Sequence, residues 1–109
     1  MATVTIVYWR DIPAQVIVRQ GRRAAKVQLS ERFERAIDRA AMRGGARDMD
    51  AYLAEWWRSE PEPCGDDLEA VAADRAERIE QAYSDERLKS LVDAHGHEPE
   101  PPAADPVEA

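Results

Sequence analysis

Basic side chains gather in the first quarter of the chain, in a pattern that suits binding of anions or of an acidic protein surface. The charged residues of this segment that we single out are Arg10, Asp11, Arg19, Arg22, Arg23 and Lys26. Arg22 and Arg23 follow Gly21, so we expect them at the tip of a turn. Guanidinium groups bind phosphates and carboxylates through charge-assisted hydrogen bonds. A second basic set would extend this patch along a helix: Arg32, Arg35, Arg39 and Arg43.

Three tryptophans form a second candidate binding feature. Trp56 and Trp57 are adjacent within a stretch of helical spacing, and two adjacent residues of a helix cannot both point at one core. Trp9 ends a predicted strand that is apolar on both faces, so this strand is either central and covered or presents Trp9 to a partner. Because tryptophan is enriched at binding hot spots, we expect at least one of the three in a groove rim or interface. The alternative is that all three cover a small core.

The residues that usually perform catalysis or hold metals do not form a known pattern. The single cysteine, Cys64, excludes an internal disulfide and any multi-cysteine metal site within one chain. It follows two prolines in an expected exposed linker, where acidic neighbours do not favour a reactive thiolate. His95 and His97 flank one glycine and have no third convergent ligand. The sequence also lacks the nucleophile-elbow, phosphate-loop and HExxH patterns, so we expect no catalytic residue, metal or cofactor.

The composition indicates one small cytoplasmic domain. The chain has 109 residues, of which 44% are hydrophobic and 34% charged, as in soluble globular proteins. No apolar run approaches the about 20 residues that span a bilayer, and the N-terminus lacks the pattern of a signal peptide. The net charge of −7 and the lack of a recognisable module argue against nucleic-acid binding.

The charge is divided unevenly along the chain. Residues 1–47 carry ten Arg or Lys against four Asp or Glu, whereas residues 48–109 carry five against eighteen, giving balances of +6 and −13. The two halves can attract each other within the molecule or between copies. One alternative folds the acidic region back on the basic face. The other is a homodimer in which first strands pair across a twofold axis and shield Trp9.

Residues 3–29 predict the scaffold, a three-stranded antiparallel meander. β-Branched residues alternate with period two on both sides of turns at residues 10–14 and 20–23, which is typical of strands. Pro13 cannot donate to a strand ladder, so it belongs in a connection or at a strand start. The inward face of the third strand is expected to carry Ala25, Val27 and Leu29. With the helices that follow, the meander predicts an α+β fold.

Two helices are expected to pack on this sheet. Ser30 is a suitable cap for the first, which would bury Phe33 and Ile37 and end at residues 44–45. Asp48 would cap the second, which carries Trp56 and Trp57.

The rest of the chain is expected to be helical and then disordered. Residues 66–94 predict either one long helix or two, with Ser84 as the cap of the second and Gly96 at the end. The prolines and acids that follow predict a disordered tail. The expected divisions are an α+β core at 1–59, a linker at 60–65, a C-terminal helical region at 66–96 and a tail at 97–109.

The stretch from residue 4 to residue 57 resembles a small bacterial family labelled virulence factor. Its most specific part is YWRDIPAQV at residues 8–16, supported by DAYLAEWW at residues 50–57. The resemblance covers the region up to about residue 60 and leaves residues 65–109 unaccounted for. In Gram-positive members a related segment is attached to helical-repeat regions. This chain is similar to the stand-alone members typical of Alphaproteobacteria.

The resemblance implies an accessory role in one-carbon metabolism, because such members are often encoded near cobalamin-dependent methyl-transfer and methylenetetrahydrofolate reductase components. It implies no reaction and no catalytic residues. Our leading hypothesis is a non-catalytic subunit that docks on a larger protein, such as one of those components, through the loops between residues 10 and 23 and an exposed tryptophan. One alternative is a subunit that binds or converts an anionic pterin, nucleotide or polyglutamate. Another is a regulatory nucleic-acid binder.

Overall fold

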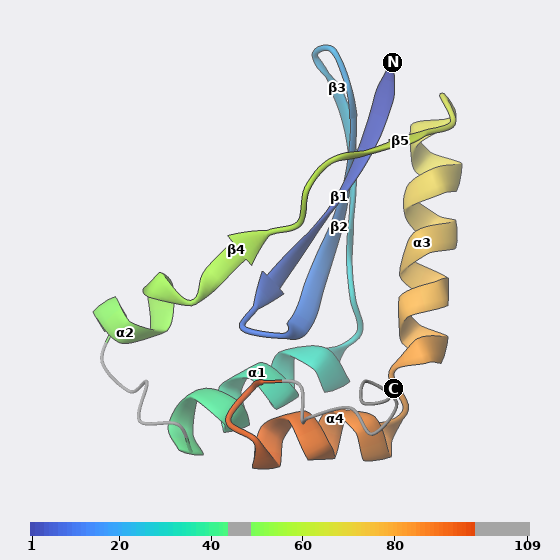
Figure 1. Cartoon of the computed structure of the whole chain (residues 1–109). Coiled ribbons are helices and arrows are strands. Elements are labelled where there is room, and N and C mark those ends of the chain that lie inside the picture. Colours follow the sequence, from blue (N-terminus) through green and yellow to red (C-terminus); the bar gives the residue numbers. More distant parts are fainter. Residues whose placement is uncertain (44–48, 98–109) are drawn as a thin grey trace, which may run out of the picture.

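The computed structural model describes residues 1–43 and 49–97. In chain order, the elements are β1 (Ala2–Trp9), β2 (Ile12–Gln20), β3 (Arg23–Gln28), α1 (Glu31–Arg43), α2 (Met49–Ala54), β4 (Trp56–Arg58), β5 (Glu62–Cys64), α3 (Leu68–Ala82) and α4 (Asp85–Asp93). Helix α3 runs along one side of the antiparallel sheet, and α1 and α4 lie across one end of it (Figure 1). The predicted α+β class is confirmed. The predicted helix end at residues 44–45, the Asp48 cap and the tail beyond His97 lie outside the described residues.

Strand β1 lies inside the sheet. The strand order is β3-β2-β1-β4, and β5 pairs with β1 on the same side as β4. Between these two short strands, the amide of Ser59 donates to the Ile6 carbonyl and its Oγ accepts from the Ile6 amide, both at 2.9 Å. The predicted pairing of first strands in a homodimer is therefore wrong, because both edges of β1 are already occupied within the chain.

The predicted meander is confirmed, and β4 and β5 extend it into a five-stranded sheet. Each added strand has three residues, too few to show an alternating pattern in the sequence. β5 falls inside the stretch expected to be a linker and contains Pro63, which an edge strand tolerates. Cys64 is half-buried in this strand rather than exposed.

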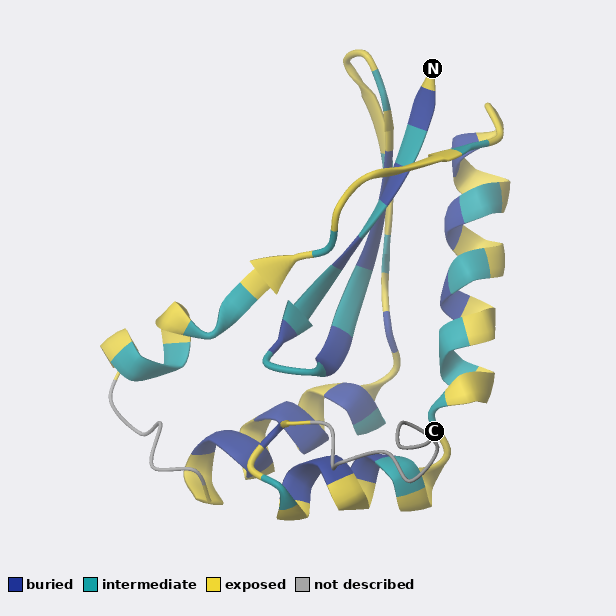
Figure 2. Cartoon of the chain, in the orientation of Figure 1, coloured by how far each residue is buried: buried dark blue, intermediate teal, exposed yellow. Residues whose placement is uncertain are grey.

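One face of the sheet forms the core against α3. The buried strand residues on this face are Ala2, Val4, Ile6, Val16 and Val18, and α3 contributes Leu68, Ala72 and Ala76 to the same cluster (Figure 2). Full burial of a Val or Leu side chain contributes roughly 1.5–3 kcal/mol. Since α4 also adds buried side chains to this cluster, the region after residue 66 shares its core with the meander.

A bulge redirects the end of β1. Val7 lies opposite Gln15, but Tyr8 lies opposite Pro13, so one residue of β2 has no partner across the ladder. Beyond this shift, Trp9 is 0% exposed, and its Nε1 donates to the Tyr52 carbonyl at 2.9 Å. The alternative in which β1 is central and covered is confirmed, and the alternative in which it presents Trp9 to a partner is wrong.

The two tryptophans at residues 56 and 57 lie on a strand, which corrects the predicted second helix. Helix α2 ends at Ala54, and β4 pairs Trp56 with Trp9 and Trp57 with Tyr8. Aromatic side chains favour strands and gain energy from cross-strand aromatic neighbours. Their spacing also matched a helical face, which is why the sequence pattern misassigned them.

The predicted helix beginning after Ser30 is confirmed as α1, which buries Phe33 and Ile37. The region after residue 66 forms two helices, and Ser84 caps the second by accepting a hydrogen bond from the Arg87 amide. Gly96, which has a φ of +92°, follows α4 and donates to the Leu91 carbonyl at 2.7 Å. These residues had been predicted as the boundaries of the helices.

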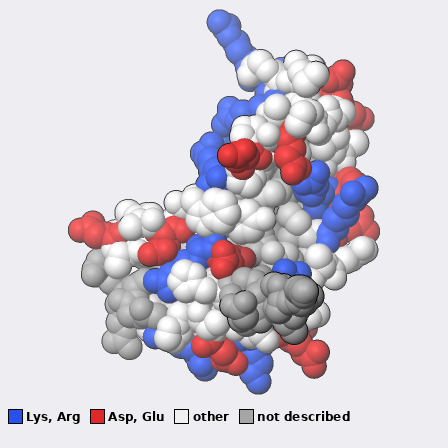
Figure 3. Space-filling model, viewed as in Figure 1, with Lys and Arg blue, Asp and Glu red and all other residues white. Residues whose placement is uncertain are grey.

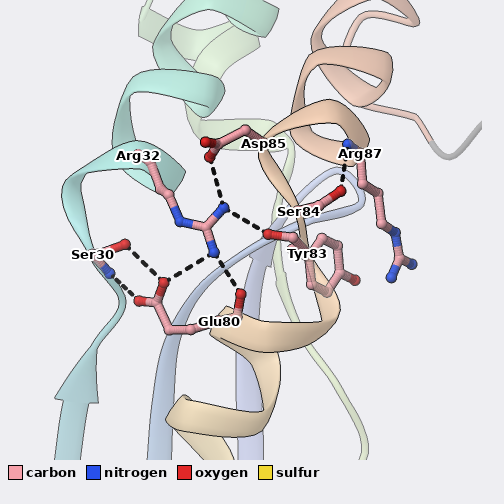
Figure 4. Close-up of polar contacts among 7 residues, drawn as sticks. All are labelled: Ser30, Arg32, Glu80, Tyr83, Ser84, Asp85 and Arg87. Carbon is pink, nitrogen blue, oxygen red and sulfur yellow. Dashed lines mark hydrogen bonds and ion pairs between the residues drawn. The ribbon is translucent and has the colours of Figure 1, made fainter.

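Arg32 fastens α1 to the turn between α3 and α4 (Figure 4). Its guanidinium donates to the carbonyl oxygens of Glu80 at 2.5 Å and Tyr83 at 2.6 Å, and forms ion pairs with the carboxylates of Glu80 and Asp85. A cation at this position satisfies carbonyl groups that a helix leaves unpaired at its C-terminus. Glu80 also accepts hydrogen bonds from the amide and hydroxyl of Ser30. This network joins the basic and acidic halves within the molecule, as one sequence alternative proposed.

We call the end of the molecule at which these contacts gather the closed end. It comprises residues 9–12, α1, α4 and the turn between α3 and α4.

Candidate interaction surface

The residues predicted to bind a partner do not form one compact patch. Arg22 and Arg23 lie at the β2–β3 hairpin, Arg19 and Lys26 lie further along β2 and β3, and the remaining predicted residues lie at the other end of β2: Trp9, Arg10, Asp11, Trp56 and Trp57. A strand of nine residues spans about 30 Å, so the hairpin tip is far from this last group, whereas Lys26, opposite Ile17, lies between them.

Arg10 contributes to folding at the closed end. The backbone of Arg10 has a φ of +54°, and the Arg10 Nη1 donates to the His95 carbonyl at 2.6 Å. Its side chain is 13% exposed, lies 4.8 Å from the centre of the Trp9 ring, and places Nε 3.4 Å from a Glu55 carboxylate oxygen. The Asp11 amide donates to the Gly96 carbonyl at 2.8 Å. The turn at residues 10 and 11 is thus held against the end of α4.

The sheet face turned away from α3 carries two of these cations, Arg19 and Lys26. We call it the open face. Its strand residues are Thr3, Thr5, Val7, Gln15, Ile17, Arg19, Ala24, Lys26, Gln28 and Arg58. This assignment follows from strand alternation, because cross-strand partners share a face and the neighbouring residues Val4, Val16 and Val18 belong to the α3 core.

Three cations and no carboxylate lie among these strand residues of the open face. Arg19, Lys26 and Arg58 are all exposed, and none forms an ion pair with another described residue. Lys and Arg side chains gather beside the strands on the side away from α3 (Figure 3). Ile17 is 3% exposed although it lies outside the main core cluster, so side chains of this face cover it. The sequence did not identify Arg58, because its place on this face depends on β4.

An exposed aromatic pair lies where β4 meets β1. The rings of Tyr8 and Trp57 stack with centroids 4.7 Å apart and planes 11° from parallel. Trp57 is 46% exposed, and its Nε1 donates to the Arg10 carbonyl at 2.5 Å. Burial raises the pKa of Tyr8, while the charge of Arg75 lowers it. Trp57 thus lies at the surface, and the expectation of a tryptophan in an interface stays a prediction.

The arginines of α1 do not extend the basic patch formed by the residues on or beside the β2–β3 hairpin. They line a separate groove of about 380 Å³ between α1 and α4, at the opposite end of the sheet, with Lys89 as an additional cation. Arg35 pairs with Glu31 and Arg43 with Asp93. Arg39 and Lys89 have no ion-pair partner among the residues described.

Metal-binding geometry is not found in the part of the chain that the structure describes. No group of three or more His, Cys, Asp or Glu side chains in residues 1–43 and 49–97 is placed to hold an ion. Over the same ranges, no helix combines the length and apolar character needed to cross a membrane.

Comparison with known proteins gives a family and one relative. The model of the family described as "Virulence factor" matches residues 7–92, so the match extends beyond residue 60 through α3 and α4. A curated relative, "Uncharacterized protein YpgR" of Bacillus subtilis (strain 168), is 34% identical over 91 residues, which is 84% of this chain. The chain spans about a quarter of that relative, 23% of its length. No solved structure matches. Because the family match includes most of the chain and both of its layers, the protein belongs to the virulence factor family.

Proposed function

We propose that this protein is a non-catalytic interaction subunit that docks through its open face on an acidic surface of a larger protein. The observation that carries this proposal is the set of three exposed cations on a sheet face whose β1–β4 residues include no carboxylate. A protein of net charge −7 repels an acidic partner over most of its surface. An acidic partner is therefore expected to approach this protein with the open face towards it.

The exposed edge beside this face supplies apolar contact area. Beside Arg58, a cavity of about 240 Å³ is lined by Val7 and Trp56, and by Trp57 at the sheet edge that β4 forms. The Trp57 ring itself stacks on Tyr8, its cross-strand partner on the α3 side of the sheet. Tryptophan anchors with arginine beside them are typical of binding hot spots.

The identity of the partner rests on the family resemblance. Relatives resembling this chain are encoded near cobalamin-dependent methyl-transfer and methylenetetrahydrofolate reductase components. We therefore propose a cytoplasmic partner among these enzymes, to which the subunit contributes binding and no catalytic group.

Affinity capture with matched charge reversals tests the docking proposal. The tagged full chain is used at low salt beside Arg19→Glu/Lys26→Glu, and the control is Arg39→Glu/Lys89→Glu, which changes the net charge equally in the α1–α4 groove. We expect one methyl-transfer or reductase component to be retained by the wild type and the control, lost from the open-face variant, and released by salt. Retention of the same partner by all three proteins would contradict the proposal.

The α1–α4 groove favours a second candidate function, binding of a small anionic ligand. Arg39 and Lys89 are free among the described residues, and Arg35 and Arg43 lie beside them in a groove of about 380 Å³. This volume falls within the range of about 300–1,000 Å³ typical of small-molecule sites. Equilibrium dialysis against a pterin polyglutamate and a nucleotide tests it, with Arg19→Glu/Lys26→Glu now as the control. Lack of binding at millimolar ligand would exclude this candidate.

A further inference from the structure

A second groove lies between α1, α2, β4 and the end of β3, where Gln28 of the open face forms part of its lining. Its volume is about 200 Å³. Its apolar lining includes Phe33, Ile37, Tyr52 and Trp56, and its two charged residues are Glu34 and Asp38. The sequence did not identify this groove, because Tyr52 of α2 and Trp56 of β4 fall in a stretch that the sequence pattern assigns to a single helix.

The aromatic walls stand at right angles to each other. The rings of Tyr52 and Trp56 have centroids 6.0 Å apart and an interplanar angle of 82°. Both residues are partly exposed, so ring surface is available to a ligand. Aromatic faces attract cations. Trp9 stacks on Tyr52 with ring centroids 5.8 Å apart, so a ligand meets the part of the Tyr52 ring that Trp9 leaves uncovered.

The two carboxylates stand at an unfavourable spacing. Glu34 and Asp38 are four residues apart on α1, where like charges repel, and both are exposed. Neither forms an ion pair with a described residue. Burial raises the pKa of Tyr52 and the charge of Asp38 raises it further, while a hydrogen bond with Trp56 lowers it. The groove thus carries two negative charges that a bound cation would neutralise.

The lining selects among cations. Calcium takes six to eight oxygen ligands and magnesium six, and two carboxylates beside apolar rings do not provide such a set. A volume of about 200 Å³ lies below the range of drug-sized ligands and suits an organic cation of a few non-hydrogen atoms.

We infer that this groove binds a small organic cation, an alkylated ammonium or a guanidinium, with its charge between Glu34 and Asp38 and its body against Tyr52 and Trp56. This binding uses none of Arg19, Lys26 and Arg58, although it shares Trp56 with the cavity beside Arg58.

Proton–nitrogen NMR of the full chain tests the inference, with the adjacent tryptophans as reporter and control. Tetramethylammonium chloride and methylguanidinium chloride are titrated separately at constant ionic strength, with sodium chloride as the balancing salt. We expect a saturable shift of the Trp56 indole signal with at least one of the two cations, while the Trp57 indole signal, assigned with Trp57→Phe, stays in place.

Charge variants then locate the site. Glu34→Gln/Asp38→Asn should weaken binding about tenfold or more. This variant should fold, since it removes a like-charge pair, and thermal melting checks this. Glu60→Gln/Glu69→Gln removes the same charge elsewhere and should bind like the wild type. A response without saturation for both cations, an equal shift of Trp57, or unchanged affinity of Glu34→Gln/Asp38→Asn would overturn the inference.

Discussion

The closed end and the open face use the same kind of side chain in opposite ways. At the closed end, the Arg32 guanidinium donates to two carbonyls and pairs with two carboxylates. On the open face, Arg19 and its two neighbouring cations have no ion-pair partner among the described residues. Both arginines belong to the basic half of the chain, so a count of charges could not separate them. The difference indicates that Arg32 stabilises the fold, whereas Arg19, Lys26 and Arg58 have charges that no described residue neutralises.

The largest expected difference in stability is between substitutions of Trp9 and Trp57. Trp9→Ala removes a side chain that is 0% exposed in the core, and we expect a loss of about 3–5 kcal/mol in the free energy of unfolding. Trp57→Ala removes a half-exposed ring stacked on Tyr8 and should lose about 1 kcal/mol. Urea unfolding followed by circular dichroism measures both. Similar losses would show that the surface tryptophan is a structural residue.

Arg32 and Arg19 provide the corresponding test for the cations. Arg32→Ala leaves the carbonyls of Glu80 and Tyr83 without their donor, and we expect a loss of about 2 kcal/mol, limited because the side chain is 32% exposed. Arg19→Ala should change stability by less than about 0.5 kcal/mol. The measurement is the shift of the urea midpoint at constant slope. A loss in Arg19→Ala as large as in Arg32→Ala would mean that the open face also serves the fold.

Gly96 and Gly21 compare the two regions at the level of the backbone. Both have positive φ, +92° and +61°. A Cβ on Gly96 would lie 2.9 Å from Cζ3 of Trp9, whereas one on Gly21 would meet nothing within 4 Å. We expect Gly96→Ala to lose about 2 kcal/mol and Gly21→Ala about 1 kcal/mol, the second from backbone conformation alone. Thermal melting of the two variants checks this order, and its reversal would contradict close packing of Gly96 on Trp9.

The meander and α1 could be predicted from the sequence because their signals are local. Period-two alternation defined the three long strands, and Ser30 with the stripe through Phe33 and Ile37 defined the helix. Trp56 and Trp57 could not be placed in the same way. They continue the helical spacing of the apolar residues before them, and a strand of three residues is too short to show an alternating pattern of its own. Their position depends on pairing with β1, more than forty residues earlier in the chain.

The site was harder to predict than the fold, because local sequence does not report a partner in space. The turn chemistry at Gly21 correctly predicted Arg22 at a hairpin tip, with Arg23 directly after it as the first residue of β3. Arg10 has the same charge, yet it is held by Glu55 and the His95 carbonyl, 45 and 85 residues away in the sequence. Only the fold distinguishes such a cation from a free one.

The smallest predicted change in stability comes from Tyr8 and Tyr52, and it is expected only at high pH. Burial raises the pKa of both phenols above the unfolded value of 10.0, so the folded state keeps these protons to higher pH than the unfolded chain does. The resulting stabilisation is complete below pH 10 and is lost as the pH rises towards the folded pKa values. Tyr8→Phe and Tyr52→Phe should each reduce the loss of stability above pH 10, which urea unfolding at several pH values measures.

Salt separates the two tyrosines because their charged neighbours differ. Asp38 and Glu34 both raise the pKa of Tyr52, so screening should lower it, and Glu34→Gln/Asp38→Asn should do the same at low salt. For Tyr8, Arg75 and Arg87 act against Asp11 and Glu62, so screening should move its pKa little. Absorbance at the wavelength of tyrosinate measures each ionisation in variants that also carry Tyr83→Phe and keep either Tyr8 or Tyr52 as their single tyrosine. A salt response that is larger for Tyr8 than for Tyr52 would contradict the negative character of the groove and, with it, the site assigned to a cation.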